Sequence, residues 1–229
     1  MRAVHAWSAM KVPLVVAVVA ARRAGELPGG RALTAQERQA IGAAISASDN
    51  DAAGRLYGEL VAAFGGDAPA VARIQRVLER AGDPTTRVEA EVTRPGFTND
   101  GQTVWSLHAM ARFYRALAWG CLARPADSRL ITEAMRAPEA VQRWGAVPAP
   151  WPAPARVGVK GGWGPTAAGG GEYEVLQASV IATPRAGVVL VVATTGPGTT
   201  FAVGQRRATR LARTVARGTR ELPRRRDRC

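Results

Sequence analysis

Hydrophobic residues in the first two thirds of the chain recur at the spacing of three to four positions that is typical of helices. Residues 8–22 form an almost wholly apolar run, which predicts a buried helix although Pro13 removes one backbone donor. Thr34 and Glu37 stand ahead of the next periodic segment with the spacing of a capping box. The predicted helices cover residues 8–22, 34–45, a segment around 56–64, a segment that Asp67 caps and Gly82 ends, 106–121 and 128–136.

The pattern changes after a proline-rich segment at residues 147–155. Apolar runs rich in β-branched residues follow, separated by turn sequences, and they predict antiparallel hairpins. The predicted strands cover residues 156–160, 174–183 and 187–195, and an amphipathic helix over 200–217 follows them. An irregular stretch from Gly82 to Val104 is a long loop, and loops of that length are often functional.

The predicted fold class is therefore α/β of the α+β kind, an antiparallel sheet (about 155–195) flanked by helices with an all-helical lobe (about 30–146). We expect one domain over residues 1–217 and a basic, disordered tail over 218–229.

Composition argues against two classes of protein. Apolar residues make up 47% and charged residues 21% of the chain, as in a globular domain rather than a disordered one. No apolar run reaches the length of a membrane-spanning helix. Cys121 is predicted as a buried thiol and Cys229 as part of the charged tail, with a bridge between them as the alternative.

The net charge of +13 is concentrated at the C-terminus, where residues 205–229 carry ten arginines against Glu221 and Asp227. Such a segment is either a solvated basic face or a weak contact for anionic surfaces, and the lack of interleaved aromatic residues argues against nucleic acid. His5 and His108 have no cysteine or carboxylate at ligand spacing, so we expect no metal and no cofactor. We expect a monomer.

Lysine and asparagine are scarce. Of 31 basic residues only Lys11 and Lys160 are lysines, and Asn50 and Asn99 are the only asparagines. A GC-rich genome would replace both residue types wherever arginine or aspartate could serve. Arginine does not lose its proton near neutral pH, whereas a desolvated lysine can act as a base. The surviving lysines therefore indicate positions where the chemistry needs them.

Three short motifs contain both lysines and one of the asparagines. They are Ser8-x-x-Lys11, Ser48-Asp49-Asn50 and Lys160-Gly161-Gly162. Each alone has a simpler interpretation as a helix cap, a turn or a solvated strand end. In this order, however, they are typical of a serine nucleophile with a lysine base.

With these motifs the chain resembles the penicillin-recognising serine hydrolases, the class A β-lactamase and penicillin-binding-protein superfamily. It is most similar to a group of actinobacterial β-lactamase-related serine hydrolases, some of them lipoproteins. The resemblance extends from about Trp7 to Arg217 and is carried by "AWSAMKVP", "SDNDAAGRLY", "PGFTNDGQTVWSL", "RFYRAL" and "VKGGWGP". It favours a buried nucleophile helix for "VPLVVAVVA" over a secretory signal peptide.

The resemblance implies a role for each motif. Ser8 would attack a carbonyl and form an acyl-enzyme, and Lys11 would take the hydroxyl proton. Ser48 would relay a proton to the leaving group, and Asn50 would donate a hydrogen bond to the substrate. Lys160 would attract a substrate carboxylate and help to lower the pKa of Lys11.

The resemblance also implies an oxyanion hole and a contact strand. The backbone N–H groups of Ser8 and Trp163 would form the oxyanion hole, beside the strand that carries Gly161 and Gly162. Asp49 is expected to hold only its own loop.

The chain departs from the family in three ways. Lys160-Gly161-Gly162 lacks the usual hydroxyl residue, so we expect weak recognition of carboxylates and of β-lactams. Neither Glu89 nor Glu91 has the Glu-x-x-x-Asn spacing of the residue that activates the deacylating water. Only seven residues precede Ser8, so two strands of the family sheet are expected to be missing and an edge to be unpaired. Either the natural protein is longer, with an export signal, or this member is degenerate.

Two functions follow from this sequence. The first is a serine hydrolase outside the cytoplasm that acts on amide or ester bonds of small-molecule, β-lactam-like or peptidoglycan-like substrates, with weak or absent β-lactam turnover. The alternative is a catalytically inactive binding protein of the cell envelope with the same fold.

Overall fold

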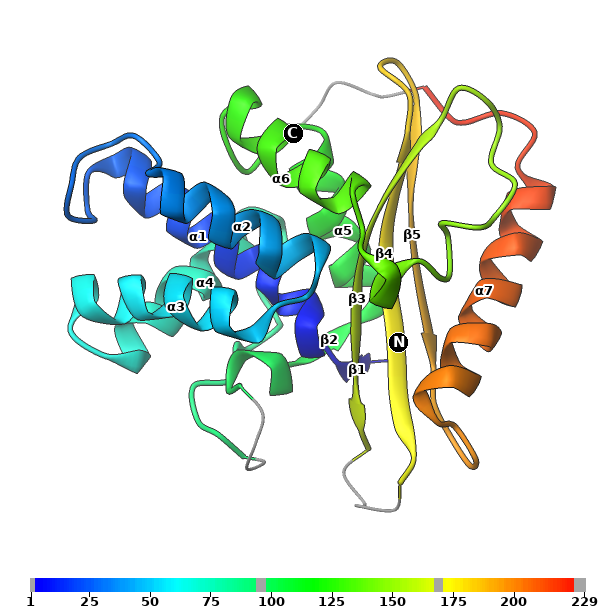
Figure 1. The fold of residues 1–229 in the computed structure, drawn as a ribbon, viewed down its shortest axis with the longest axis horizontal. Helices are drawn as coiled ribbons and strands as arrows, with labels where there is room; N and C mark the ends of the chain where they lie inside the picture. Colours follow the sequence, from blue (N-terminus) through cyan, green and yellow to red (C-terminus); the bar gives the residue numbers. More distant parts are fainter. Residues whose placement is uncertain (1–2, 94–97, 167–170, 225–229) are drawn as a thin grey trace.

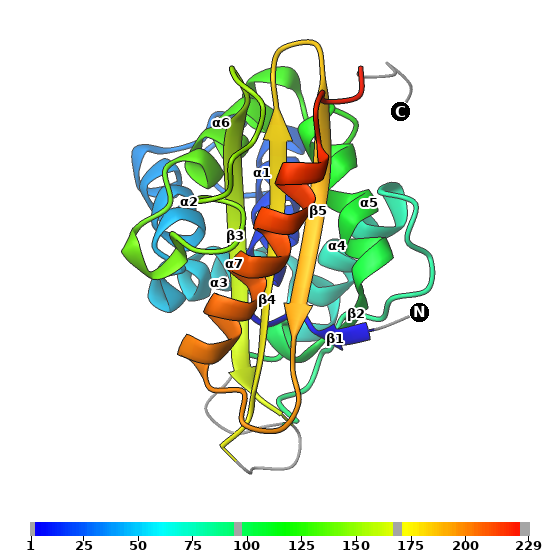
Figure 2. The same cartoon turned by 90° about the vertical axis from the view of Figure 1, so that its right-hand side faces the viewer.

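The computed structural model describes residues 3–93, 98–166 and 171–224. Its centre is a three-stranded antiparallel sheet of β3 (Arg156–Pro165), β4 (Tyr173–Ala182) and β5 (Gly187–Thr194), in the order β3-β4-β5. The helix α7 (Phe201–Gly218) covers one face of the sheet, and the other helices lie on the opposite face (Figures 1 and 2). The predicted fold class, an antiparallel sheet flanked by helices with a helical lobe, is confirmed.

The helical side is built around α1 (Lys11–Ala24), which is buried along most of its length. Pro13 fits because it lies in the first turn, where backbone N–H groups have no partner within the helix. The helices that surround α1 are α2 (Ala35–Ser46), α3 (Asn50–Phe64), α4 (Asp67–Arg80), α5 (Leu107–Ala118) and α6 (Pro125–Arg136).

Local signals placed most helix ends correctly. Thr34 and Glu37 form both hydrogen bonds of the predicted capping box. The prediction that Asp67 caps α4 is wrong, since Gly66 occupies the cap position and Asp67 is the first helical residue. Its carboxylate instead accepts a hydrogen bond from the hydroxyl of Tyr57 at 2.9 Å.

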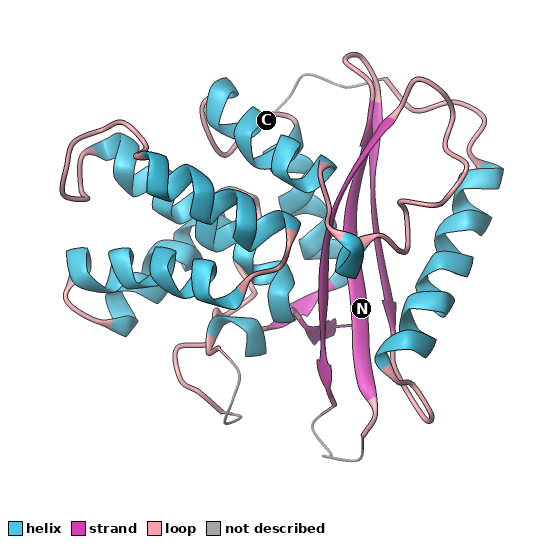
Figure 3. Cartoon of the chain, in the orientation of Figure 1, coloured by secondary structure: helices cyan, strands magenta, loops and turns pink. Residues whose placement is uncertain are grey.

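A second, two-stranded sheet lies beside the main one, where β1 (Ala3–His5) pairs with β2 (Val104–Ser106) (Figure 3). In the described part of the chain no segment ahead of Ser8 joins the main sheet. β5 is the last strand in the order of the described sheet, and its residues 188–191 are partly exposed.

Two predictions near the C-terminus need correction. Residues 219–224 are not disordered, because the carbonyl of Pro223 accepts a hydrogen bond from the N–H of Gly187 at 2.9 Å. Residues 225–229 lie outside the described part. Cys121 is half-buried and disulfide-bonded rather than a buried thiol, and Cys229 lies outside the described residues. Within the described ranges no helix is long and apolar enough to cross a membrane.

Candidate functional site

Ser8 lies in a short 3₁₀ turn, η1 (Trp7–Met10), that leads directly into α1. The preceding residue, Trp7, has a φ of 48°, a left-handed conformation that is strained for a bulky side chain. Its indole N–H donates to the Glu174 carboxylate at 3.3 Å, and the same carboxylate oxygen lies 2.6 Å from Nδ1 of His5. Neighbouring side chains therefore hold the nucleophile turn in its unusual shape.

Strand β3 approaches this turn so closely that two positions require glycine. A Cβ atom at Gly162 would lie 2.4 Å from the carbonyl oxygen of Ala6, and one at Gly164 would lie 2.6 Å from the ring of Trp7. Both distances are far below van der Waals contact. The glycines of "KGGWG" thus bring the backbone of β3 against the turn that carries Ser8.

Lys11 is buried beneath the turn, with 4% of its surface exposed. Its ammonium donates to the backbone carbonyl of Ser48 at 2.5 Å and to Oδ1 of Asn50 at 2.6 Å. Burial lowers the pKa of Lys11 to about 8, although the carboxylates of Asp100 and Asp49 act in the opposite direction. A substantial fraction of the amine is therefore neutral in mildly alkaline solution and able to accept a proton.

Residues 48–50 form the turn between α2 and α3. Ser48 has a φ of 61°, a second strained position. Asp49 caps α3 by accepting the N–H of Ala52 at 2.8 Å, as expected of a residue that holds its own loop. Because Oδ1 of Asn50 accepts from Lys11, its amide nitrogen is left to donate toward a substrate.

Lys160 lies behind this turn rather than on a free strand end. Its side chain is fully buried and donates to Oγ of Ser48 at 2.9 Å and to Oε1 of Gln142 at 3.0 Å. Burial and the nearby charge of Lys11 lower the pKa of Lys160 well below its ordinary value. Burial is the main cause of the lowered pKa at Lys11, and the expected contribution of Lys160 to it stays a prediction.

Gln142 is a site residue that no local sequence pattern indicates. Its amide donates to the carbonyls of Ile45 and Ser46 at 2.6 and 2.7 Å, while its oxygen accepts from Lys160 and from the N–H of Gly161 at 2.8 Å. It thereby ties β3 to the end of α2 just before the turn of Ser48.

An open cleft of about 520 Å³ lies over these residues. This is within the usual size of small-molecule sites. Ser8, Ser48, Asn50 and Trp163 line it, whereas Lys11, Lys160, Gly161 and Gly162 do not. The structure thus brings four of the predicted site residues to the cleft surface. The two lysines and the two glycines support them from behind.

A smaller cavity of about 50 Å³ lies on the inner side of Ser8. Ser8 and Lys11 line it together with Asp100, a buried carboxyl that we did not select from the sequence. The long loop of residues 82–104 pointed to this region, and the scarce Asn99 is the neighbour of Asp100. Neither Glu89 nor Glu91 lines either cavity.

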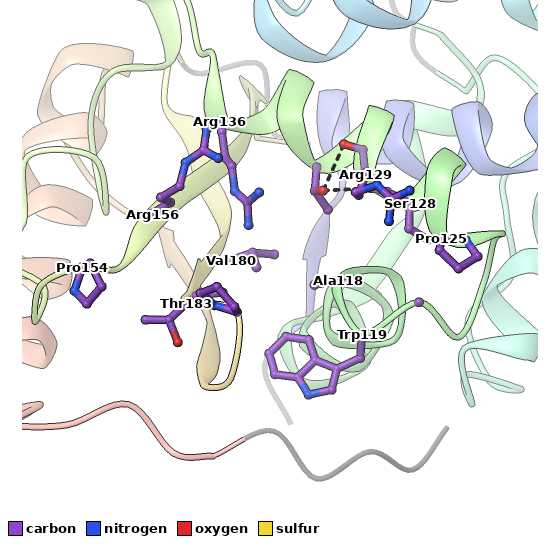
Figure 4. Close-up of a pocket in the computed structure, with 14 residues that line it drawn as sticks. Ala118, Trp119, Pro125, Ser128, Arg129, Arg136, Pro154, Arg156, Val180 and Thr183 are labelled. Atoms are coloured by element: carbon purple, nitrogen blue, oxygen red, sulfur yellow. Dashed lines mark hydrogen bonds between the residues drawn. The ribbon is translucent and has the colours of Figure 1, made fainter.

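A separate basic pocket of about 420 Å³ shares no lining residue with the cleft. Figure 4 shows Arg136 and Arg156 on one side of this pocket and Arg129 on the other, with Trp119 below them in this view. Two of these arginines are paired with Glu133, at 2.7 and 2.9 Å. No predicted site residue lies here. The described residues also contain no group of three or more side chains suited to holding a metal ion.

The sequence profile of the β-lactamase enzyme family matches residues 28–220. The chain belongs to this family. Among solved structures, an ancestral class A β-lactamase is similar at 24% identity, with a TM-score of 0.69, over 95% of this chain and 86% of that one. A β-lactamase from Xanthomonas campestris is similar at 22% identity, with a TM-score of 0.65, over 94% and 84% of the two chains. Both likenesses concern the fold. No curated protein matches the chain.

Proposed function

We propose that this member of the β-lactamase family is a serine hydrolase that forms an acyl-enzyme on Ser8. The observation that carries the proposal is the position of Ser8, which lies on a strained turn and lines an open cleft, with a buried lysine of lowered pKa one helical turn away. Lys11 in its neutral form accepts the hydroxyl proton as Oγ attacks the carbonyl carbon. Ser48, held by Lys160, returns a proton to the leaving group.

The carbonyl oxygen of the substrate gains negative charge in this step. The N–H of Ser8 lies at the start of a helix, where backbone donors have no helical partner, and Trp163 stands on the strand that packs against the same turn. These two N–H groups are the proposed oxyanion hole. Asn50 would donate its free amide to the acyl side of the substrate.

The cleft favours a neutral substrate. Its lining is dominated by Trp7, Trp163, Tyr173 and Pro165, and it includes no charged side chain from the described residues. Lys160, the expected carboxylate partner, is buried instead. We therefore propose ester or amide substrates with a neutral acyl group, small or cell-wall-peptide-like, and weak or absent turnover of β-lactams, which carry a carboxylate.

A position outside the cytoplasm is part of the proposal. The disulfide at Cys121 supports it, because disulfides persist mainly in oxidising compartments.

Hydrolysis of p-nitrophenyl acetate by the purified protein tests the proposal. The wild type should release p-nitrophenol continuously, Ser8→Ala should not, and Ser46→Ala should keep the wild-type rate. Ser46 is a suitable control because it lies two residues from Ser48 but lines neither cavity. Equal rates for the wild type and Ser8→Ala would refute the proposal and favour the binding-protein alternative.

A further inference from the structure

Asp100 is a buried carboxyl that the acylation step does not use. It belongs to the 3₁₀ turn η2 (Asp100–Gln102), and only 6% of its surface is exposed. One carboxylate oxygen accepts the N–H of Gly101 at 2.9 Å. Burying a carboxyl group costs free energy unless it is paired, and such groups are frequent in functional sites.

The turn of Asp100 packs directly against the turn of Ser8. An added Cβ on Gly101 would lie 3.5 Å from the carbonyl oxygen of Trp7, the residue before the nucleophile. Asp100 and Ser8 therefore face one cavity from two adjoining turns, and the other polar residues of its wall are Lys11, Tyr57, Thr98 and Asn99.

This cavity has the size and the polarity for water. A volume of about 50 Å³ exceeds the space that one water molecule needs, and a buried water requires two to four polar partners. Ser8, Lys11 and Asp100 supply them. Lys11 and Asp100 form no salt bridge in the described part of the chain, since the ammonium donates to Ser48 and Asn50 instead.

Ser8 lies at the boundary of the two cavities, because it lines both the open cleft and the inner cavity, as Trp7 and Thr98 also do. An acyl group on Oγ would enter from the cleft, where there is room for a substrate. A water molecule held by Asp100 would then meet the acyl carbon from the inner side. This arrangement keeps the water apart from the leaving-group side of the cleft.

Building on the proposed function, we propose that Asp100 is the catalytic base for the water that releases the acyl group from Ser8. Its carboxylate takes one proton as the water oxygen bonds to the acyl carbon. The tetrahedral adduct then collapses, the bond between the acyl carbon and Oγ breaks, and Oγ takes the proton from Asp100. The acid product leaves, and both the serine hydroxyl and the carboxylate are regenerated.

The electrostatic environment of Asp100 suits this role. Burial raises the pKa of its carboxyl above the ordinary value, in spite of hydrogen bonds from Thr98 and Gly101 and the positive charge of Lys11. A carboxylate with a raised pKa is a stronger base. Tyr57, which also lines the cavity, keeps its proton, because burial raises its pKa to about 12.

The test is the pre-steady-state reaction with p-nitrophenyl acetate, in which the acetyl-enzyme is followed by intact-protein mass spectrometry. In Asp100→Asn we expect an acylation burst of near wild-type rate and deacylation slowed about 100-fold or more, the usual contribution of a positioned base. Hydroxylamine, a nucleophile that needs no base, should release the accumulated acetyl group. Asp49→Asn is the matched control, since it removes the other carboxylate near Lys11 while asparagine still caps α3.

Deacylation of Asp100→Asn at the wild-type rate would overturn the role of Asp100. The role would also be overturned if acylation and deacylation were slowed to the same extent in Asp100→Asn and in Asp49→Asn. Absence of any acetyl-enzyme and of p-nitrophenol release in the wild type would instead refute the proposed function. The wild type also allows a test that requires no substitution. Deacylation and acylation should follow different pH profiles, because Asp100 is the base in the first and Lys11 in the second, and one common pH profile for both steps would contradict the proposal.

Discussion

The side chain of Gln142 forms four hydrogen bonds, more than any other side chain described at the site. The loss of stability on its removal can therefore be estimated. In Gln142→Leu the apolar replacement is similar in volume but satisfies none of the four partners. The carbonyl of Ser46 keeps another donor, the N–H of Glu139 at 3.0 Å, and Lys160 keeps Ser48 and Gly161. The N–H of Gly161 and the carbonyl of Ile45 are the groups left without the partner they have in the native protein.

An unsatisfied buried polar group costs about 1–3 kcal/mol, so two of them cost about 4 kcal/mol. That is a large part of the total stability of about 5–15 kcal/mol that folded proteins have. Urea unfolding followed by tryptophan fluorescence measures the loss. Labelling of Ser8 should fall as well, because Lys160 and the turn of Ser48 lose their shared anchor.

Gln36→Leu is the control, since Gln36 is exposed on α2 and should change stability by no more than about 0.5 kcal/mol. A loss below about 1 kcal/mol in Gln142→Leu, with Ser8 labelling intact, would refute the reasoning about this network.

Further predictions concern the base, the close approach of β3 and the substrate. The rate of Ser8 acylation should rise with pH up to about 8, because the neutral amine of Lys11 is the form that accepts a proton. Lys11→Arg should lower this rate at least about 100-fold, and a flat pH profile of the wild type would exclude Lys11 as the base. Gly162→Ala should lower the melting temperature and displace Ser8, whereas Gly58→Ala, at a helical position with free space, should leave the melting temperature unchanged or raise it slightly. Equal melting temperatures for Gly162→Ala and the wild type would contradict the close packing of β3 against the turn of Ser8. Neutral aryl esters should acylate Ser8 faster than matched esters whose acyl group carries a carboxylate, because no charged side chain of the described residues lines the cleft. Faster acylation by the carboxylate esters would contradict the proposed preference for neutral substrates.

Much of the site could be predicted because its residues lie in short motifs with a fixed spacing. The pair of Ser8 and Lys11, one turn apart, requires only a helix, and Ser48 and Asn50 share one turn. Gln142 and Asp100 have no such signal. Gln142 lies 97 positions from Ile45 in the chain and joins the site only through tertiary packing. Asp100 becomes notable only because η2 packs beside η1, a contact that no local pattern encodes.

The fold shows the same limit. Helical periodicity and the capping box predicted α2 within one residue, since both are local. The strand predicted at residues 156–160 extends to Pro165, because glycines weaken a strand pattern even where close packing requires them. The order at residues 219–224 depends on pairing with the start of β5, which is distant in sequence from the tail.

Mass spectrometry of the intact protein after treatment with a fluorophosphonate probe, and separately with a penicillin, tests the central claim most directly. Peptide mapping should then place the fluorophosphonate adduct on Ser8. The account predicts one fluorophosphonate adduct on the wild type, none on Ser8→Ala, and slow or no modification by the penicillin. Absence of any adduct on the folded wild type, or an adduct that persists in Ser8→Ala, would contradict the assignment of Ser8 as the nucleophile.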